Sequence, residues 1–122
     1  MRMTPEPRGA GPIVTGFGAG GFRVGEARFA AVMLTVEAAS DWLPPALDAL
    51  DVAAVQPLVD ARPEFILLGS GATLRRPPPA FGRALDALGI GLEVMDSRAA
   101  ARAWGVLRGE GREVAAALYP LD

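Results

Sequence analysis

One short segment of the sequence carries residue types suited to binding an anion. Gly69-Ser70-Gly71 follows an apolar run, and Arg75 and Arg76 come shortly after it. Small residues at a strand end let backbone N–H groups face a ligand, and two guanidinium groups can form a fork around an oxoanion. Ser97 follows the next apolar run, where a helix is expected to begin. The predicted anion-binding crevice therefore consists of Gly69, Ser70, Gly71, Arg75, Arg76 and Ser97.

The same residues also have an ordinary structural interpretation. Gly69 and Gly71 would then only turn the chain, Ser97 would cap a helix, and the two arginines would be solvated. Asp96 argues against an anion unless it pairs with one of those arginines. Both interpretations stay open from the sequence.

The composition removes most catalytic chemistry. The chain has no Cys, His, Lys or Asn, and all 12 of its basic residues are Arg. This excludes a thiolate nucleophile, an imidazole base, a Schiff-base lysine and a zinc–thiolate site. Ser70 and Ser97 lack an obvious base that would activate them as nucleophiles. We therefore expect no enzymatic activity and no cofactor.

Three glycines match a nucleotide-binding pattern without its required context. Gly16, Gly18 and Gly21 have the spacing G-x-G-x-x-G. The dinucleotide motif needs a helix directly afterwards, so that the helix N-terminus meets the pyrophosphate. Phe22-Arg23-Val24 and another β-rich run follow instead, so we reject this motif.

The acidic side chains suggest no metal site. The nearest pairs are Asp48 with Asp51 and Glu110 with Glu113, and either pair would need further oxygen ligands to hold Mg²⁺. We interpret them as solvated surface charges. The net charge of −2 provides no basic footprint for nucleic acid.

Three arginines are expected on the outer face of the last predicted helix. They are Arg98, Arg102 and Arg108. A stripe of this kind is usually a solvated surface, but it also suits docking of an acidic partner.

Hydrophobic patterning predicts the elements that position these residues. Residues 12–36 indicate a β-hairpin or meander that ends in a strand over 27–36. The later strands are predicted at 64–69, 90–95 and 113–118, and the helices at 79–88 and 98–109, after short helices within 46–61. Alternating strands and helices favour parallel pairing in the second half. The predicted fold is a three-layer α/β domain around a central mixed β-sheet, with an N-terminal antiparallel meander.

The predicted organisation is one domain with a short leader. Residues 1–12 are rich in Pro, Gly and charge and are expected to be a flexible leader, whereas residues 13–122 form a single α/β domain. The longest strongly apolar stretch, Phe29 to Val36, is far shorter than the roughly 20 residues of a membrane helix. We therefore predict a cytoplasmic protein that is not an integral membrane protein.

Four motifs in register resemble a known family. The motifs are Gly16–Val24, Leu67–Gly71, Val94–Ser97, and Val106-Leu107 followed by Glu110–Leu118. In this order they resemble the small domain-of-unknown-function family whose animal members include a mitochondrial respiratory complex I assembly factor and an adipogenesis-associated relative. The resemblance implies a three-layer α/β fold around a mixed sheet and no established enzymatic activity. The chain departs from the family pattern at Ala103-Trp104-Gly105, where relatives commonly carry a Thr-Tyr-Asn-like stretch.

Three hypotheses about function follow. The resemblance implies a non-catalytic interaction or assembly-factor-like domain, which binds a protein partner of unknown identity and aids assembly of a respiratory or membrane complex. The alternative is a small-anion or nucleotide-binding domain, with its crevice at the sheet edge near Gly69–Gly71. A third hypothesis is a homo-oligomer whose sheet edge or helix face is an interface.

Overall fold

A mixed sheet of five strands forms the middle layer of the computed structural model, which describes residues 11–18 and 21–121. The strands lie in the order β5-β4-β8-β6-β7. Their bounds are Val32–Leu34 for β4, Ala39–Asp41 for β5, Phe65–Gly69 for β6, Gly91–Met95 for β7 and Ala115–Leu118 for β8. β6 is parallel to β7 and β8, whereas β4 is antiparallel to β5 and β8. The predicted mixed sheet is therefore confirmed.

The register brings one end of every central strand into a single row. Val32 pairs with Asp41 and with Leu118, Leu118 pairs with Gly69, and Gly69 pairs with Met95. Four segments that leave the sheet after these strands consequently start at one edge, which we call the carboxyl edge. Ligands of open α/β folds usually bind at this edge, and it contains the predicted crevice.

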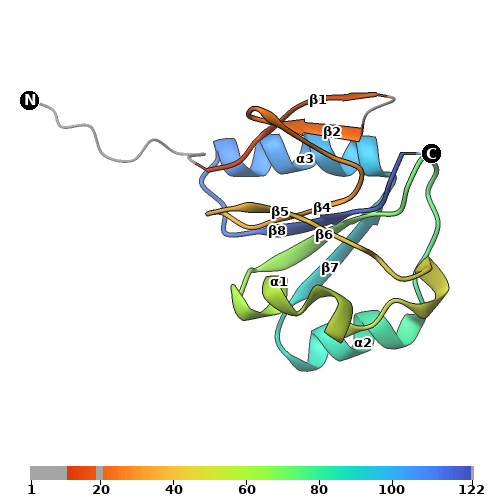
Figure 1. Cartoon of the computed structure of the whole chain (residues 1–122). Helices are drawn as coiled ribbons and strands as arrows, with labels where there is room; N and C mark the ends of the chain where they lie inside the picture. The colour runs from red at the N-terminus through yellow and green to blue at the C-terminus, as the bar shows by residue number, and fades with distance from the viewer. Residues whose placement is uncertain (1–10, 19–20, 122) are drawn as a thin grey trace, which may run out of the picture.

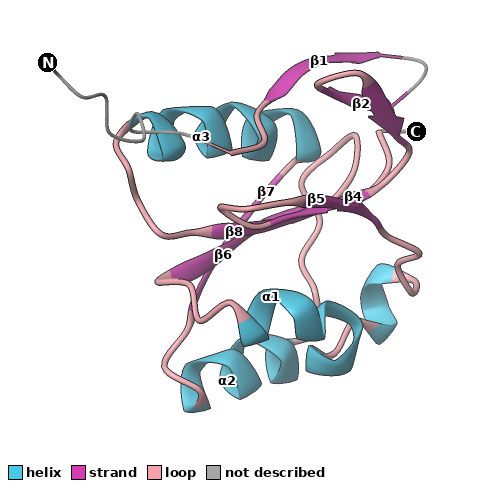
Figure 2. Ribbon diagram, turned by 60° about the vertical axis from the view of Figure 1, so that its left-hand side comes forward, coloured by secondary structure: helices cyan, strands magenta, loops and turns pink. Residues whose placement is uncertain are grey.

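Both faces of the central sheet are covered, as Figure 2 shows. The middle of β6 reflects this, because Ile66 and Leu68 pack into the core on one side and Leu67 packs into the core on the other. A strand buried on both faces is apolar at nearly every position, which is why residues 65–69 form a continuous apolar run.

Helices alone cover the lower face of the sheet (Figure 2). They are the 3-10 helices η1 (Leu47–Ala49) and η2 (Val52–Val55), and the α-helices α1 (Gln56–Asp60) and α2 (Pro79–Ala87). In α2 the side chains of Phe81 and Leu85, one turn apart, are both buried. The helix predicted over 79–88 from this spacing is confirmed.

The upper face is covered by one long helix and by a small antiparallel sheet (Figure 1). The helix α3 spans Ser97–Gly109, and the sheet consists of β1 (Val14–Gly18), β2 (Gly21–Val24) and β3 (Ala27–Phe29). β2 begins at Gly21, so no helix follows the three glycines. The fully buried Trp104 of α3 donates a hydrogen bond of 2.9 Å from Nε1 to the carbonyl of Pro12.

The expectation of a single strand over 27–36 is wrong. β3 ends at Phe29 in the upper sheet, and β4 begins at Val32 in the central sheet. Ala30 and Ala31 carry the chain from one layer to the other. The apolar run does not reveal this crossing, because the strand in the upper sheet and the strand in the central sheet both need apolar residues where they face a core.

The expected position of Arg108 on the outer face of its helix is also wrong. Arg108 lies one turn after Trp104 and is only 7% exposed. Its guanidinium donates a hydrogen bond of 2.6 Å from Nη1 to the carbonyl of Arg112. The aliphatic stem packs inward while the charged head reaches a backbone acceptor, as long basic side chains can do.

Most of the predicted leader, residues 1–12, lies outside the described residues. Only its last two residues, Gly11 and Pro12, are described. In the described part of the chain, no helix is both long and apolar enough to span a bilayer.

Candidate functional site

The predicted crevice begins where β6 ends at the carboxyl edge, in a loop that Ser70 organises. The Ser70 hydroxyl donates to the carbonyl of Thr73 at 2.7 Å and accepts from the amide of Arg75 at 2.9 Å. The amide of Ser70 donates to the carbonyl of Met95, also at 2.9 Å. Ser70 is thus a structural residue of this loop, and its amide and hydroxyl both have partners within the protein.

Ser97 ties three segments of the carboxyl edge together. Its hydroxyl accepts from the amide of Gly71 at 2.9 Å and donates to the carbonyl of Tyr119 at 2.8 Å. Its own amide donates to the carbonyl of Gly71 at 2.8 Å. The side chain is fully buried. Asp96, rather than Ser97, caps α3, because its carboxylate accepts from the amide of Ala99 at 2.9 Å.

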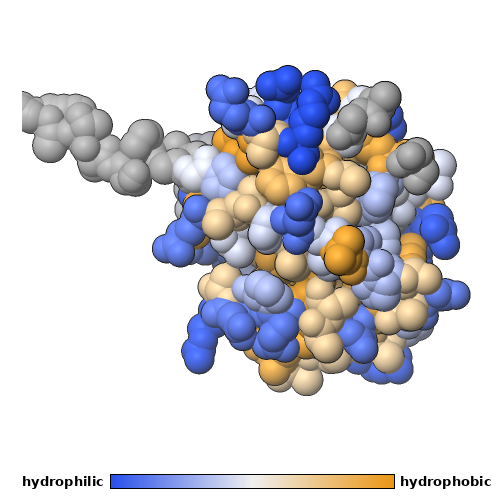
Figure 3. All heavy atoms as spheres, in the orientation of Figure 1, coloured by the Kyte–Doolittle hydropathy of each residue, from blue (hydrophilic) through white to orange (hydrophobic). Residues whose placement is uncertain are grey.

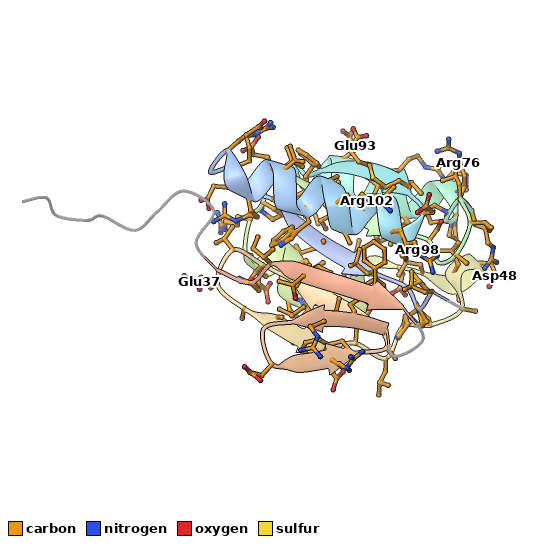
Figure 4. The ribbon with its side chains drawn as sticks, turned by 90° about the horizontal axis from the view of Figure 1, so that it is seen from above. Glu37, Asp48, Arg76, Glu93, Arg98 and Arg102 are labelled. Atoms are coloured by element: carbon orange, nitrogen blue, oxygen red, sulfur yellow. The ribbon has the colours of Figure 1, made fainter. Side chains whose placement is uncertain are left out.

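A cavity of about 250 Å³ lies beside this loop. Its lining residues are Ser70, Gly71, Ala72, Thr73, Arg75, Tyr119 and Pro120. The amides of Ala72 and Thr73 have no hydrogen-bond partner in the described part of the chain. The structure therefore brings Arg75 together with Ser70 and Gly71, whereas Arg76 and Ser97 do not line the cavity. Arg76 projects from the surface, as Figure 4 shows.

Tyr119 connects this loop with the segment that follows β5. Its hydroxyl donates to the carbonyl of Pro45 at 2.8 Å, and its ring packs edge-on against Trp42 with 4.9 Å between centroids. Burial raises the pKa of Tyr119 to about 12, and the negative charge of Asp48 acts in the same direction, whereas the positive charge of Arg75 opposes the rise. Tyr119 is thus placed between the two loops.

Two leucines are exposed on the loops that Tyr119 connects. Leu43 is 96% exposed and Leu74 is 54% exposed. We call Leu43, Leu74, Arg75 and Arg76 the edge surface. On the face of the whole molecule drawn in Figure 3, mostly weakly apolar groups cover the middle and strongly hydrophilic groups lie above them. Sequence reasoning missed Leu43 and Leu74, because an isolated leucine in a loop carries no periodic signal of burial or exposure.

The other charged candidates have structural roles or no ligand set. Asp51 caps η2 by accepting from the amide of Ala54 at 3.2 Å. Within residues 11–18 and 21–121, no group of three or more acidic residues is arranged to hold a metal ion.

The comparisons with known proteins match this fold over nearly its whole length. A model of a protein family of unknown function, DUF498/DUF598, matches residues 14–119. The chain belongs to this family. It is 37% identical over 122 residues to an uncharacterized protein of Rhodobacter capsulatus, covering 98% of this chain and 94% of that protein. The motif-based prediction of a family of unknown function is thereby confirmed.

Solved structures similar to this DUF498/DUF598 member have the same fold. The crystal structure of a Bordetella parapertussis protein superposes with a TM-score of 0.82 at 34% identity, covering 91% of this chain and 97% of that chain. The solution structure of a Bordetella pertussis protein, described as a Mth938-like domain, gives a TM-score of 0.78 at 28% identity, covering 98% of this chain and 92% of that chain. The predicted α/β fold class is confirmed.

Proposed function

We propose that this DUF498/DUF598 member is a non-catalytic interaction domain that binds a protein partner through its edge surface. The observation that carries the proposal is the exposure of Leu43 and Leu74 on two loops joined by Tyr119. A single exposed leucine needs no explanation, but apolar groups rimmed by charge at one edge are typical of protein–protein contacts. Arg75 and Arg76 supply that rim, and Arg is enriched in interfaces.

The motifs of this chain resemble those of a family that includes an animal complex I assembly factor. This resemblance suggests that the partner is a subunit of a larger complex. We propose a cytoplasmic role in which the domain holds a subunit of a respiratory or membrane complex during assembly. The net charge of −2 argues against nucleic acid as the partner. A chain without Cys, His or Lys supports a role in binding rather than in catalysis.

Leu74 and Leu88 make a matched pair of variants for testing the edge surface. Both leucines are 54% exposed, but Leu88 follows α2, at the opposite edge of the central sheet from Leu74. The experiment is cross-linked affinity capture from cells of the source organism, with wild type, Leu43→Ser, Leu74→Ser and Leu88→Ser as baits. We expect one partner to be retained by wild type and Leu88→Ser and depleted about tenfold by Leu43→Ser and by Leu74→Ser.

Equal capture by all four baits would show that the partner binds elsewhere, and capture of nothing above background would remove the interaction hypothesis. Size-exclusion mass of the purified protein tests the homo-oligomer hypothesis in the same set of variants. A dimer that dissociates in Leu43→Ser and in Leu74→Ser but not in Leu88→Ser would identify the partner as a second copy.

Binding of a small anion in the loop cavity is a second candidate function. It is favoured by the 250 Å³ cavity, which contains Arg75 and adjoins the amides of Ala72 and Thr73. Its test is a thermal-shift panel of phosphates, nucleotides and carboxylates, with Arg75→Ala/Arg76→Ala as the control protein. A ligand at about 100 times its Kd should add roughly 2.7 kcal/mol of stability, or several degrees. A shift that persists in the double variant would exclude this cavity as the site.

A further inference from the structure

Two arginines on successive turns of α3 rest on one aromatic ring of β1. The guanidinium carbon of Arg98 lies 5.7 Å from the centroid of the Phe17 ring, and that of Arg102 lies 5.4 Å from it. Figure 4 shows both arginines on α3, with Arg98 on the side of the helix that faces β1. Both guanidinium groups therefore lie against the same ring, that of Phe17.

Neither guanidinium has an anionic counterpart in the described part of the chain. No ion pair and no hydrogen bond of Arg98 or Arg102 is formed with residues 11–18 or 21–121. Each guanidinium carries five N–H donors, and none of them has a hydrogen-bond acceptor in the described part of the chain. Glu93 lies across α3 from Arg98 in Figure 4. The carboxylate of Asp96 caps the helix by accepting from the amide of Ala99.

The position of these arginines on α3 is electrostatically unfavourable for the protein alone. Arg98 lies in the first turn of a helix of 13 residues, where the positive end of the helix dipole repels a cation. Arg102 follows at i+4, and like charges at this spacing repel each other. Bound anions relieve both repulsions.

We propose that Arg98 and Arg102, oriented by Phe17, bind a phosphate group. Two guanidinium groups match a phosphate monoester, which carries about −1.5 to −2 charge at neutral pH and three acceptor oxygens. A carboxylate carries a single negative charge and therefore neutralises only one of the two guanidinium groups. The phosphate comes either as the free ion or on a phosphorylated small molecule, and inorganic phosphate and O-phosphoserine serve as the two probes. Neither arginine lines the cavity beside Arg75, and neither belongs to the edge surface.

The test is an NMR titration of the whole chain that follows the Nε–Hε signals of its arginines. We expect saturable shifts of the Arg98 and Arg102 signals with phosphate, and binding about tenfold weaker in Arg98→Gln and in Arg102→Gln. Phe17→Leu keeps both charges and removes the ring, and we expect it to weaken binding severalfold. A stronger response to O-phosphoserine than to phosphate would identify a phosphorylated molecule as the ligand, and the reverse would identify the free ion.

A second arginine pair in the same protein provides the matched control. Arg23 and Arg28 are both exposed and lie directly opposite each other on β2 and β3, and among the described residues no aromatic ring lies against either of them. The variant Arg23→Gln/Arg28→Gln removes the same charge and should leave the titration unchanged. Equal, unsaturable shifts at all four arginines would mean general attraction of anions and would overturn the proposal.

Two other results would also overturn it. Loss of the phosphate response in Arg75→Ala/Arg76→Ala, with retention in Arg98→Gln, would place the anion in the loop cavity instead. A saturable response to glutarate without one to phosphate would make the arginine pair a site for carboxylates.

Discussion

The hydroxyl of Ser97 accepts a hydrogen bond of 2.9 Å from the amide of Gly71, 26 positions earlier in the chain. The same hydroxyl donates to the carbonyl of Tyr119. One buried side chain thus fixes the loop after β6, the start of α3 and the segment after β8. The loops that carry the edge surface and the loop cavity depend on this connection for their positions.

Removal of the Ser97 hydroxyl should destabilise the protein. In Ser97→Ala the buried amide of Gly71 loses its acceptor and the carbonyl of Tyr119 loses a donor, which typically costs about 1–3 kcal/mol. Urea denaturation measures the change in the free energy of unfolding. Ser40→Ala is the control, because Ser40 is exposed on β5 and its hydroxyl has no partner in the described part of the chain. An equal effect of both substitutions would contradict the structural role of Ser97.

Adding a methyl group at Gly69, as in Gly69→Ala, should destabilise the protein more than Ser97→Ala does. A Cβ there would lie 2.8 Å from the Cα of Ser97 and 2.9 Å from Cδ2 of Leu118, so the start of α3 would have to move away from β6. Overpacking of this kind costs about 1–3 kcal/mol, and backbone contact places Gly69→Ala at the upper end. The midpoint of thermal unfolding measures it. An unfolding midpoint within one degree of wild type would show that α3 and β6 are less closely packed.

Gly105→Ala, in contrast, is expected to stabilise the protein. Gly105 lies inside α3, and a Cβ there would have no atom within 4 Å. Alanine is favoured over glycine in a helix interior by about 1 kcal/mol, so the variant should be more stable by up to that amount. Thermal unfolding beside Gly69→Ala compares the two substitutions directly. A destabilised Gly105→Ala would mean that another surface covers this side of α3.

The sequence predicted the elements whose residues follow one simple pattern, either a continuous apolar run or apolar residues spaced three to four apart. The strand at residues 64–69 and the helices at 79–88 and 98–109 were predicted within one residue of their observed bounds. The division of residues 27–36 between two sheets could not be predicted, because both cores select the same apolar residues. The expected outward position of Arg108 is wrong because Arg108 lies four residues after the buried Trp104 and so shares the inner face of α3.

The sequence predicted where the candidate site lies, but it did not predict the hydrogen bonds that its residues form. Parallel strands that end at Gly69 and Met95 necessarily open at one edge, so a crevice was expected there. The hydrogen-bond partners of Ser70, Gly71 and Ser97 could not be anticipated, since the acceptors and donors are backbone groups distant in the chain. Every residue except proline carries the same backbone donor and acceptor, so the residue types do not show which backbone groups will meet.

Tyr119 makes one pH dependence unusually simple to measure. The chain has a single tyrosine and no lysine or cysteine, so among its side chains Tyr119 alone is expected to titrate between about pH 9 and 12. Its pKa is raised to about 12 in the folded protein, mainly by burial, from an ordinary value of 10. The unfolded chain therefore loses the proton first as the pH rises. The neutral tyrosine stabilises the fold fully below about pH 10, and this stability is lost as the pH rises toward 12.

The lost stability should be on the order of 2 kcal/mol, and Tyr119→Phe should abolish its pH dependence. Tyrosinate absorbance reports the ionisation of Tyr119 directly, and urea denaturation at a series of pH values reports the stability. A folded-state pKa near 10 would mean that the hydroxyl is reached by water, and hence that its bond to Pro45 is broken in solution. The loop that carries Leu43 would then be free to move away from Leu74, and the edge surface would lose the connection that holds its two halves together.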